Sequence, residues 1–232
     1  MNILALDTAT EVFSVALSTE AGNWYTEIDC GSGAGRLPRH SELLMECVDG
    51  LFKLAMFTPK ELNRIACMKG PGSFTGLRIG FSTAKGLAMA LGIPLIPVPT
   101  LDCIAATLSI WPGIIVPLID AKKGAFFSAL YRGHTRLTDY LDISPENLAL
   151  RIEKARISTE EKIVLTGPGA DLFFSNLPSI LCNDKIVVSG ESKSGRAREL
   201  LKMAKSIKIK NGMGFSSDPL YIRKSDAELS RD

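Results

Sequence analysis

The chain opens with three apolar segments separated by short polar connections, residues 2–8 (NILALDT), 12–19 (VFSVALST) and 23–29 (NWYTEID). Short segments of this kind, rich in aliphatic, β-branched and aromatic residues, are typical of β-strands. The connections are too short for a crossover helix, and the pattern therefore predicts an antiparallel meander.

A helical period follows the meander, from about residue 38 to residue 56. Its apolar positions fall on one face and are Leu44, Val48, Leu51 and Ala55, with Leu43, Cys47 and Leu54 beside them. So wide an apolar stripe predicts a helix that is buried on more than one side.

A glycine-rich segment, residues 69–80 (KGPGSFTGLRIG), joins a predicted strand to a helix that runs to Leu91. Gly72 and Gly76 are separated by three residues, whereas a Walker loop has four and then Lys-Ser/Thr. A dinucleotide fingerprint requires glycine where Thr75 stands. The spacing therefore matches neither nucleotide loop.

Two interpretations of this segment stay open. The free N–H groups and dipole of the helix N-terminus could hold an anion. Alternatively, the segment is a tight turn whose helix is capped by Ser73 or Thr75.

Small residues recur every four positions along the following helix, at Gly76, Gly80, Ala84 and Ala88. Such a row lets another element approach the helix closely. The partner could be the sheet or first helix of the same lobe. We favour a subunit interface, in which the row acts together with the wide stripe of Leu44, Val48 and Leu51.

The second half of the chain repeats the strand–turn–strand pattern. A shift of 113 residues places residues 7–17 over residues 120–130. Four of the eleven pairs are identical, and they are Asp7/Asp120, Phe13/Phe126, Ala16/Ala129 and Leu17/Leu130. Further strand and helix patterns follow to residue 205. We predict an internal duplication and two α/β lobes, residues 1–105 and 106–215, with a tail at 216–232.

Two lobes that each begin with a strand, an aspartate turn and a strand resemble the actin, sugar-kinase and Hsp70 (ASKHA) superfamily. The resemblance implies an α/β fold with a mixed sheet and helices in each lobe. It also implies that Asp7, Thr8 and Thr10 are remnants of a first phosphate loop, and that Asp120 and Lys122 belong to a second. Residues 166–169 (TGPG) would then be the nucleoside loop.

Composition indicates a soluble globular protein, with 46% hydrophobic and 22% charged residues and a net charge of +2. The segment from 191 to 224 holds nine Lys or Arg against three acidic residues. Lys202, Lys205 and Lys208 are therefore candidate contacts for a phosphate backbone, and a solvated helix face is the alternative. The five widely spaced cysteines indicate reduced thiols, and no apolar run would span a bilayer. We expect a cytoplasmic protein without a membrane partner.

Longer strings are similar to the bacterial TsaB (YeaZ) family, in the same order from end to end. They are ILALDTAT, RHSELL, GPGSFTGLRIGFSTAKGLAMALGIPLIPVPTLD, IDAKKGAFF, LTGPGADLF and PLYIRKSDAE. The resemblance implies a non-catalytic partner of TsaD, the subunit that installs N6-threonylcarbamoyladenosine (t6A) in tRNA, working with the TsaE ATPase. It implies no cofactor of its own, ATP or ADP at the level of the complex, and a homodimer without TsaD.

TsaD-like proteins carry an H-x-x-x-H pair after the glycine helix, which can bind a divalent metal. Here the two positions are Thr100 and Ile104, and the only histidines are His40 and His134. We therefore expect no metal site and no metallopeptidase activity. The alternative function is a free-standing nucleotide-dependent phosphotransferase of the sugar-kinase type, which would use Asp7 and Asp120.

Overall fold

The computed structural model describes residues 1–30, 40–181, 185–190, 193–208, 218–220 and 222, and it divides the chain into two units. Unit 1 comprises Met1–Cys103 and Lys193–Pro219, and unit 2 comprises Ile104–Ser192 and Leu220–Asp232. The sequence placed residues 106–215 together in the second lobe, whereas residues 193–219 return to unit 1. The predicted tail at 216–232 lies largely outside the described residues.

Unit 1 is built on a five-stranded sheet of order β3-β2-β1-β4-β5. Its strands are β1 (Ile3–Asp7), β2 (Val12–Ser18), β3 (Asn23–Asp29), β4 (Arg64–Gly70) and β5 (Leu95–Pro99). The first three form the predicted antiparallel meander, and β4 and β5 run parallel to β1. A short 3₁₀ helix, η1 (Pro59–Glu61), precedes β4.

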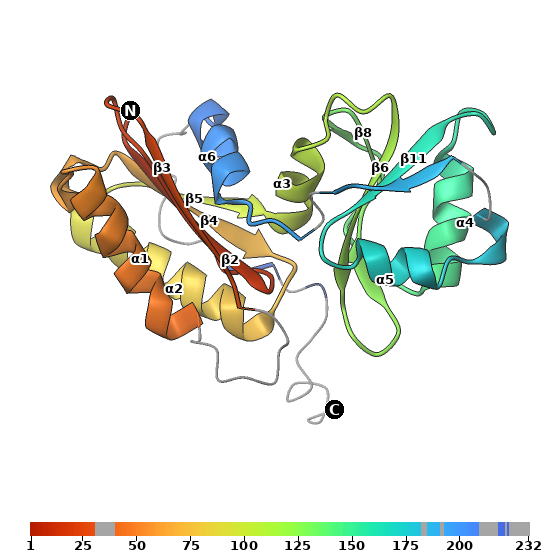
Figure 1. Cartoon of the computed structure of the whole chain (residues 1–232), viewed down its shortest axis with the longest axis horizontal. Coiled ribbons are helices and arrows are strands. Elements are labelled where there is room, and N and C mark those ends of the chain that lie inside the picture. Colours follow the sequence, from red (N-terminus) through yellow and green to blue (C-terminus); the bar gives the residue numbers. More distant parts are fainter. Residues whose placement is uncertain (31–39, 182–184, 191–192, 209–217, 221, 223–232) are drawn as a thin grey trace. The chain divides into compact units, whose positions relative to one another are not determined.

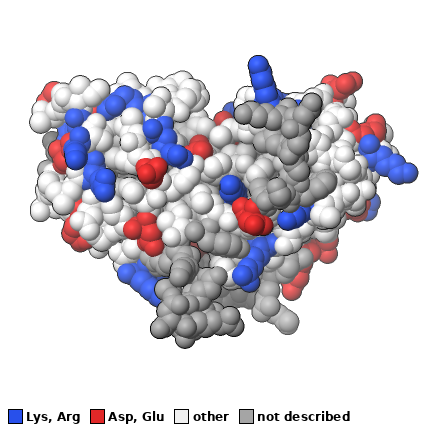
Figure 2. All heavy atoms as spheres, turned by 180° about the vertical axis from the view of Figure 1, so that it is seen from behind, with Lys and Arg blue, Asp and Glu red and all other residues white. Residues whose placement is uncertain are grey.

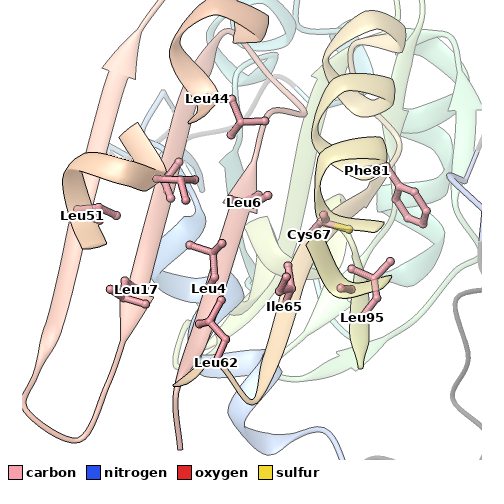
Figure 3. Packing of buried hydrophobic residues seen from close by; sticks show 14 of the residues in the cluster. Leu4, Leu6, Leu17, Leu44, Leu51, Leu62, Ile65, Cys67, Phe81 and Leu95 are labelled. Atoms are coloured by element: carbon pink, nitrogen blue, oxygen red, sulfur yellow. The ribbon is translucent and has the colours of Figure 1, made fainter. Parts of the chain in front are cut away.

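Helices cover both faces of this sheet. α1 (His40–Leu54) and α2 (Phe74–Leu91) lie side by side on one face, and α6 (Ala197–Ser206) lies on the other (Figure 1). β1 and β2 are buried throughout, because alternate side chains enter two different cores. Leu4 and Leu6 pack toward α1 and α2 (Figure 3), whereas Ile3 and Ala5 pack toward α6.

Unit 2 repeats this sheet in the order β10-β7-β6-β11-β12. Its elements are β6 (Gly113–Asp120), β7 (Phe126–Ser128), β10 (Leu141–Ile143), β11 (Lys162–Thr166), β12 (Ile186–Val188), α4 (Pro145–Ala155), α5 (Ala170–Ser175) and the 3₁₀ helix η2 (Ser179–Leu181). A small hairpin, β8 (Tyr131–Arg132) and β9 (Thr135–Arg136), extends from β6. α3 (Thr100–Ala106) spans the boundary between the units.

The two sheets share one strand order and one pattern of parallel and antiparallel neighbours, as expected for a duplication. The proposed residue alignment is only partly right. Asp7 pairs with Ser14 in unit 1, whereas Asp120 pairs with Phe126 in unit 2. The second turn is one residue shorter, so the offset falls from 113 at the aspartates to 112 in the next strand. The Phe13/Phe126 identity and the two that follow it are therefore not equivalent positions.

Candidate functional site

The first aspartate turn, residues 7–11 from the end of β1 to β2, is closed, by which we mean that the Asp7 carboxylate is fully engaged in hydrogen bonds within unit 1. Asp7 ends β1 and is 1% exposed. Its Oδ1 accepts a hydrogen bond from Ala9 N at 3.1 Å, and its Oδ2 accepts from Arg196 N at 2.9 Å and Ser14 Oγ at 3.5 Å. Both carboxylate oxygens are thus engaged by this chain.

These contacts cap α6 from another part of unit 1. Arg196 is the N-cap residue of α6 and makes no capping bond with its own side chain. Asp7 binds the N–H of Arg196, and Ser14 Oγ accepts from Ala197 N at 3.0 Å. At the other end, Arg64 Nη1 donates to the carbonyls of Ala204 and Ile207 at 2.8 and 3.1 Å. Acceptors therefore meet the N-terminus and a cation meets the C-terminus, as the helix dipole favours.

The buried position of Asp7 shifts its pKa. Burial raises the pKa of the Asp7 carboxyl, and this outweighs the lowering caused by the N–H groups of Ala9 and Arg196, the Arg196 charge and the Ser14 hydroxyl. A carboxylate that is buried and saturated with internal donors is poorly suited to bind a metal ion or order water around a phosphate.

The second aspartate turn has a different environment. Lys122 donates to Asp120 twice, from its backbone N to Oδ1 at 2.7 Å and from Nζ to Oδ2 at 2.8 Å. Burial raises the pKa of Asp120, but the hydrogen bonds and charge of Lys122 together lower it below its ordinary value. Lys122, Lys123 and Gly124 all have positive φ, which keeps the turn tight. The Lys122 ammonium group thus pairs with the Asp120 carboxylate at the place where a metal cation would otherwise bind.

The glycine-rich segment packs against the first aspartate turn. Ser73 N donates to Ala9 O at 2.8 Å, and a side chain at Gly72 would collide with that same carbonyl oxygen. Thr8 Oγ1 donates to Gly76 O at 2.7 Å, and a side chain at Gly80 would collide with the Thr8 hydroxyl. These glycines therefore allow the turn and α2 to pack closely together.

Ser73 is the N-cap of α2, and its Oγ accepts from Gly76 N at 3.3 Å. The structure thus confirms the capped-turn interpretation of this segment. Thr10, at the end of the first aspartate turn, donates from Oγ1 to Val12 O at 3.3 Å.

The TGPG turn of unit 2 is packed just as closely. Gly169 N donates to Leu118 O at 2.9 Å, and Gly167 has φ +86° with the same carbonyl against it. Added side chains at Gly167 or Gly169 would press on the end of β6. The turn stabilises the strand that carries Asp120.

The seven residues predicted to form a partner interface are buried inside unit 1, which corrects that prediction. They are Gly76, Gly80, Ala84 and Ala88 on α2 and Leu44, Val48 and Leu51 on α1. The small residues face the first aspartate turn and the sheet, and the leucines face the core (Figure 3). The alternative interpretation, packing within the lobe, is therefore correct.

The outward faces of α1 and α2 carry a different set of residues. Met45, Leu54, Phe74 and Met89 are exposed by 48%, 72%, 40% and 57%. A side chain added at Gly86 would meet no atom within 4 Å. We call this exposed part of the two helices the α1–α2 face. Leu54 was predicted as part of the apolar stripe of α1, and it is exposed. Met45, Phe74 and Met89 were not predicted as interface residues, because the interface was expected at the stripe and the row of small residues.

The remaining candidates are distributed over both units. Thr100 and Ile104 are both buried in α3. Lys202, Lys205 and Lys208 are exposed on and just after α6. Acidic and basic side chains are interspersed on the molecular face in Figure 2.

The described cysteines, Cys30, Cys47, Cys67 and Cys103, are free thiols. Within the described ranges, no three His, Cys, Asp or Glu side chains are grouped as metal ligands. No described helix is long and apolar enough to cross a membrane.

Comparison with known proteins gives the family. A model described as TsaD, tRNA N6-adenosine threonylcarbamoyltransferase, matches residues 37–212. The tRNA threonylcarbamoyladenosine biosynthesis protein TsaB of Bacillus subtilis is 28% identical, covering 98% of this chain and 96% of that protein. The chain belongs to the TsaB family.

Two further comparisons agree with this assignment. TsaB of Escherichia coli is 35% identical over 57% of this chain and 55% of its own length. The solved structure of YeaZ from Pseudomonas aeruginosa superposes with a TM-score of 0.72 at 25% identity, covering 88% of this chain and 90% of that one. The predicted TsaB (YeaZ) resemblance and two-lobed ASKHA fold are confirmed. In this TsaB chain, the carboxylates of Asp7 and Asp120 accept hydrogen bonds from other residues of the same chain.

Proposed function

We propose that this chain is a non-catalytic subunit of t6A synthesis that pairs with TsaD and supports transfer to tRNA together with the TsaE ATPase. Its membership of the TsaB family supports the pathway. The observation that carries the non-catalytic role is the closed state of Asp7, whose two carboxylate oxygens accept hydrogen bonds from Ala9, Ser14 and Arg196.

The same observation disfavours the free-standing phosphotransferase. Such an enzyme needs carboxylates that can hold a metal ion beside the transferred phosphate. Here Asp7 caps α6, and Asp120 is paired with Lys122 at 2.8 Å. The described residues at these turns do not fit a nucleotide with its metal ion. We therefore assign any ATP or ADP to the complex and not to this chain.

The α1–α2 face supports the pairing with TsaD. Exposed methionines, leucine and phenylalanine give it the apolar character of a protein interface, and Gly86 leaves room for a close approach. In the absence of TsaD, the same face would pair with its copy on a second chain, because a two-fold interface uses one surface twice.

The test is a pull-down of the tagged full chain from its native cell, followed by identification of the bound proteins. We expect TsaD as the main partner and TsaE in its company when ATP is present. Recovery of the chain with neither protein, at native expression level, would contradict the pairing.

A further inference from the structure

The outward side of α6 is a basic surface whose cations run along the helix from its first turn to just beyond its last residue. Ala197, Leu200, Leu201 and Ala204 are buried against the sheet of unit 1. The exposed positions are Ser206 and four cations, Arg198, Lys202, Lys205 and, just after the helix, Lys208. The amphipathic pattern of the helix thus gathers these four cations on its solvent side.

An aromatic side chain adjoins this surface. Tyr25 lies on β3, the edge strand of the unit 1 sheet, and is 42% exposed. The Arg198 guanidinium carbon lies 4.5 Å from the centre of the Tyr25 ring. A tyrosine ring and a guanidinium held together at the surface give two planar groups on which a nucleobase can stack.

The acidic groups near this surface do not neutralise all of its positive charge. Glu199 is paired with Lys202 at 2.9 Å, and its side chain is only 15% exposed, against 65% for the lysine. Glu27 and Asp29 of β3 lie toward the N-terminus of α6, because their strand partners are Ser14 and Val12 and Ser14 caps that terminus. Arg198 shares that end, whereas Lys205 and Lys208 lie toward the opposite end, next to the Ala204 and Ile207 carbonyls that Arg64 binds.

We propose that the α6 surface, consisting of Tyr25, Arg198, Lys202, Lys205 and Lys208, contacts tRNA. The cations bind backbone phosphates, and the Tyr25–Arg198 pair stacks under an unpaired base. An acidic peptide would satisfy the lysines but would have no planar base for that pair. The inference rests on the proposed function, because t6A synthesis acts on tRNA, and it assigns part of tRNA recognition to this subunit.

The experiment measures tRNA binding by the full chain, alone and mixed with TsaD, by fluorescence anisotropy over a range of salt concentrations. Lys202→Glu with Lys205→Glu removes two phosphate contacts. We expect affinity to fall at least about tenfold at low salt, and the slope of log K against log salt to decrease by about 0.7–0.9 for each contact. The matched control is Lys154→Glu with Lys162→Glu, two exposed lysines of unit 2 with the same charge change.

Tyr25→Leu separates stacking from charge. We expect affinity to fall about fivefold or more with an unchanged salt slope, since base stacking is not a counterion effect. Circular dichroism confirms the fold of each variant.

Unchanged tRNA affinity in the α6 variants, or an equal loss in the unit 2 control, would overturn the inference. The lysines would then serve only to complement the helix dipole. TsaD binding is measured on the same samples: loss of tRNA binding with TsaD retained supports the inference, and failure to bind TsaD in the unaltered chain contradicts the proposed function separately.

Discussion

Gly86→Arg is expected to abolish binding of this chain to TsaD while leaving the monomer folded. Gly86 lies on the exposed side of α2 with open space around its missing side chain, so arginine fits in the isolated chain. In a complex formed through this face, the arginine would have to be buried beside apolar residues such as Met89, with loss of hydration. We expect at least about a hundredfold weaker binding by calorimetry, and a monomer by light scattering.

The monomer itself should become slightly more stable, because arginine favours a helix by somewhat less than 1 kcal/mol over glycine. Gly190→Arg is the matched control, since Gly190 in unit 2 also has nothing within 4 Å of an added side chain. Normal TsaD binding by the Gly86 variant would place the interface elsewhere.

Asp7→Ala is expected to lower the free energy of unfolding by about 3 kcal/mol. The substitution leaves the N–H groups of Ala9 and Arg196 buried without their acceptor, and each such group costs about 1–3 kcal/mol. Urea denaturation followed by circular dichroism measures the loss. Asp120→Ala is the control: it removes a more exposed pair with Lys122 and should cost about 1 kcal/mol or less.

The pKa values of the two aspartates should be shifted in opposite directions from the ordinary value, and carbon NMR of their carboxyl groups can measure both. The pKa of Asp7 is raised by burial, so the folded chain holds this proton more tightly than the unfolded chain does. The stability gained from that proton is full below the ordinary value of 3.8 and is lost as pH rises through the raised pKa, whereas the hydrogen bonds to Asp7 persist. The pKa of Asp120 is lowered, so its contribution is present above 3.8 and is lost as pH falls through the lowered pKa. An Asp7 pKa below 3.8 would show that its hydrogen-bond donors outweigh burial. An equal loss of stability in both alanine variants would contradict the closed turn.

Much of the fold could be predicted because its signals are local. The meander follows from short apolar segments with short connections, and α2 is capped by Ser73, one of the two residues predicted for that position. The destination of α6 could not be predicted. Its apolar face requires a partner surface, but nothing in residues 197–206 distinguishes the sheet of unit 1 from that of unit 2.

The sequence identified the two aspartates that end equivalent strands, but not the hydrogen bonds that they make. Asp7 and Asp120 do end equivalent strands. The environment of Asp7 depends on Arg196, which is far away in sequence. The environment of Asp120 depends on Lys122, a lysine that from sequence alone could equally have contacted a phosphate. Ser14, a hydroxyl in the middle of a mostly apolar strand, was the one local signal of the α6 cap. The small-residue row indicated close packing correctly, but the pattern could not identify the turn containing Thr8 as the neighbour.

The central claim, a supporting subunit that does not itself catalyse transfer, is tested most directly by measuring t6A in tRNA after a reconstituted reaction. The mixture contains tRNA, ATP, threonylcarbamoyl-adenylate and TsaE, with this chain or TsaD omitted in turn, and nucleosides are quantified by mass spectrometry. We predict no t6A when TsaD is omitted, and strong stimulation when the chain is added to TsaD. Formation of t6A by this chain without any TsaD would contradict the account.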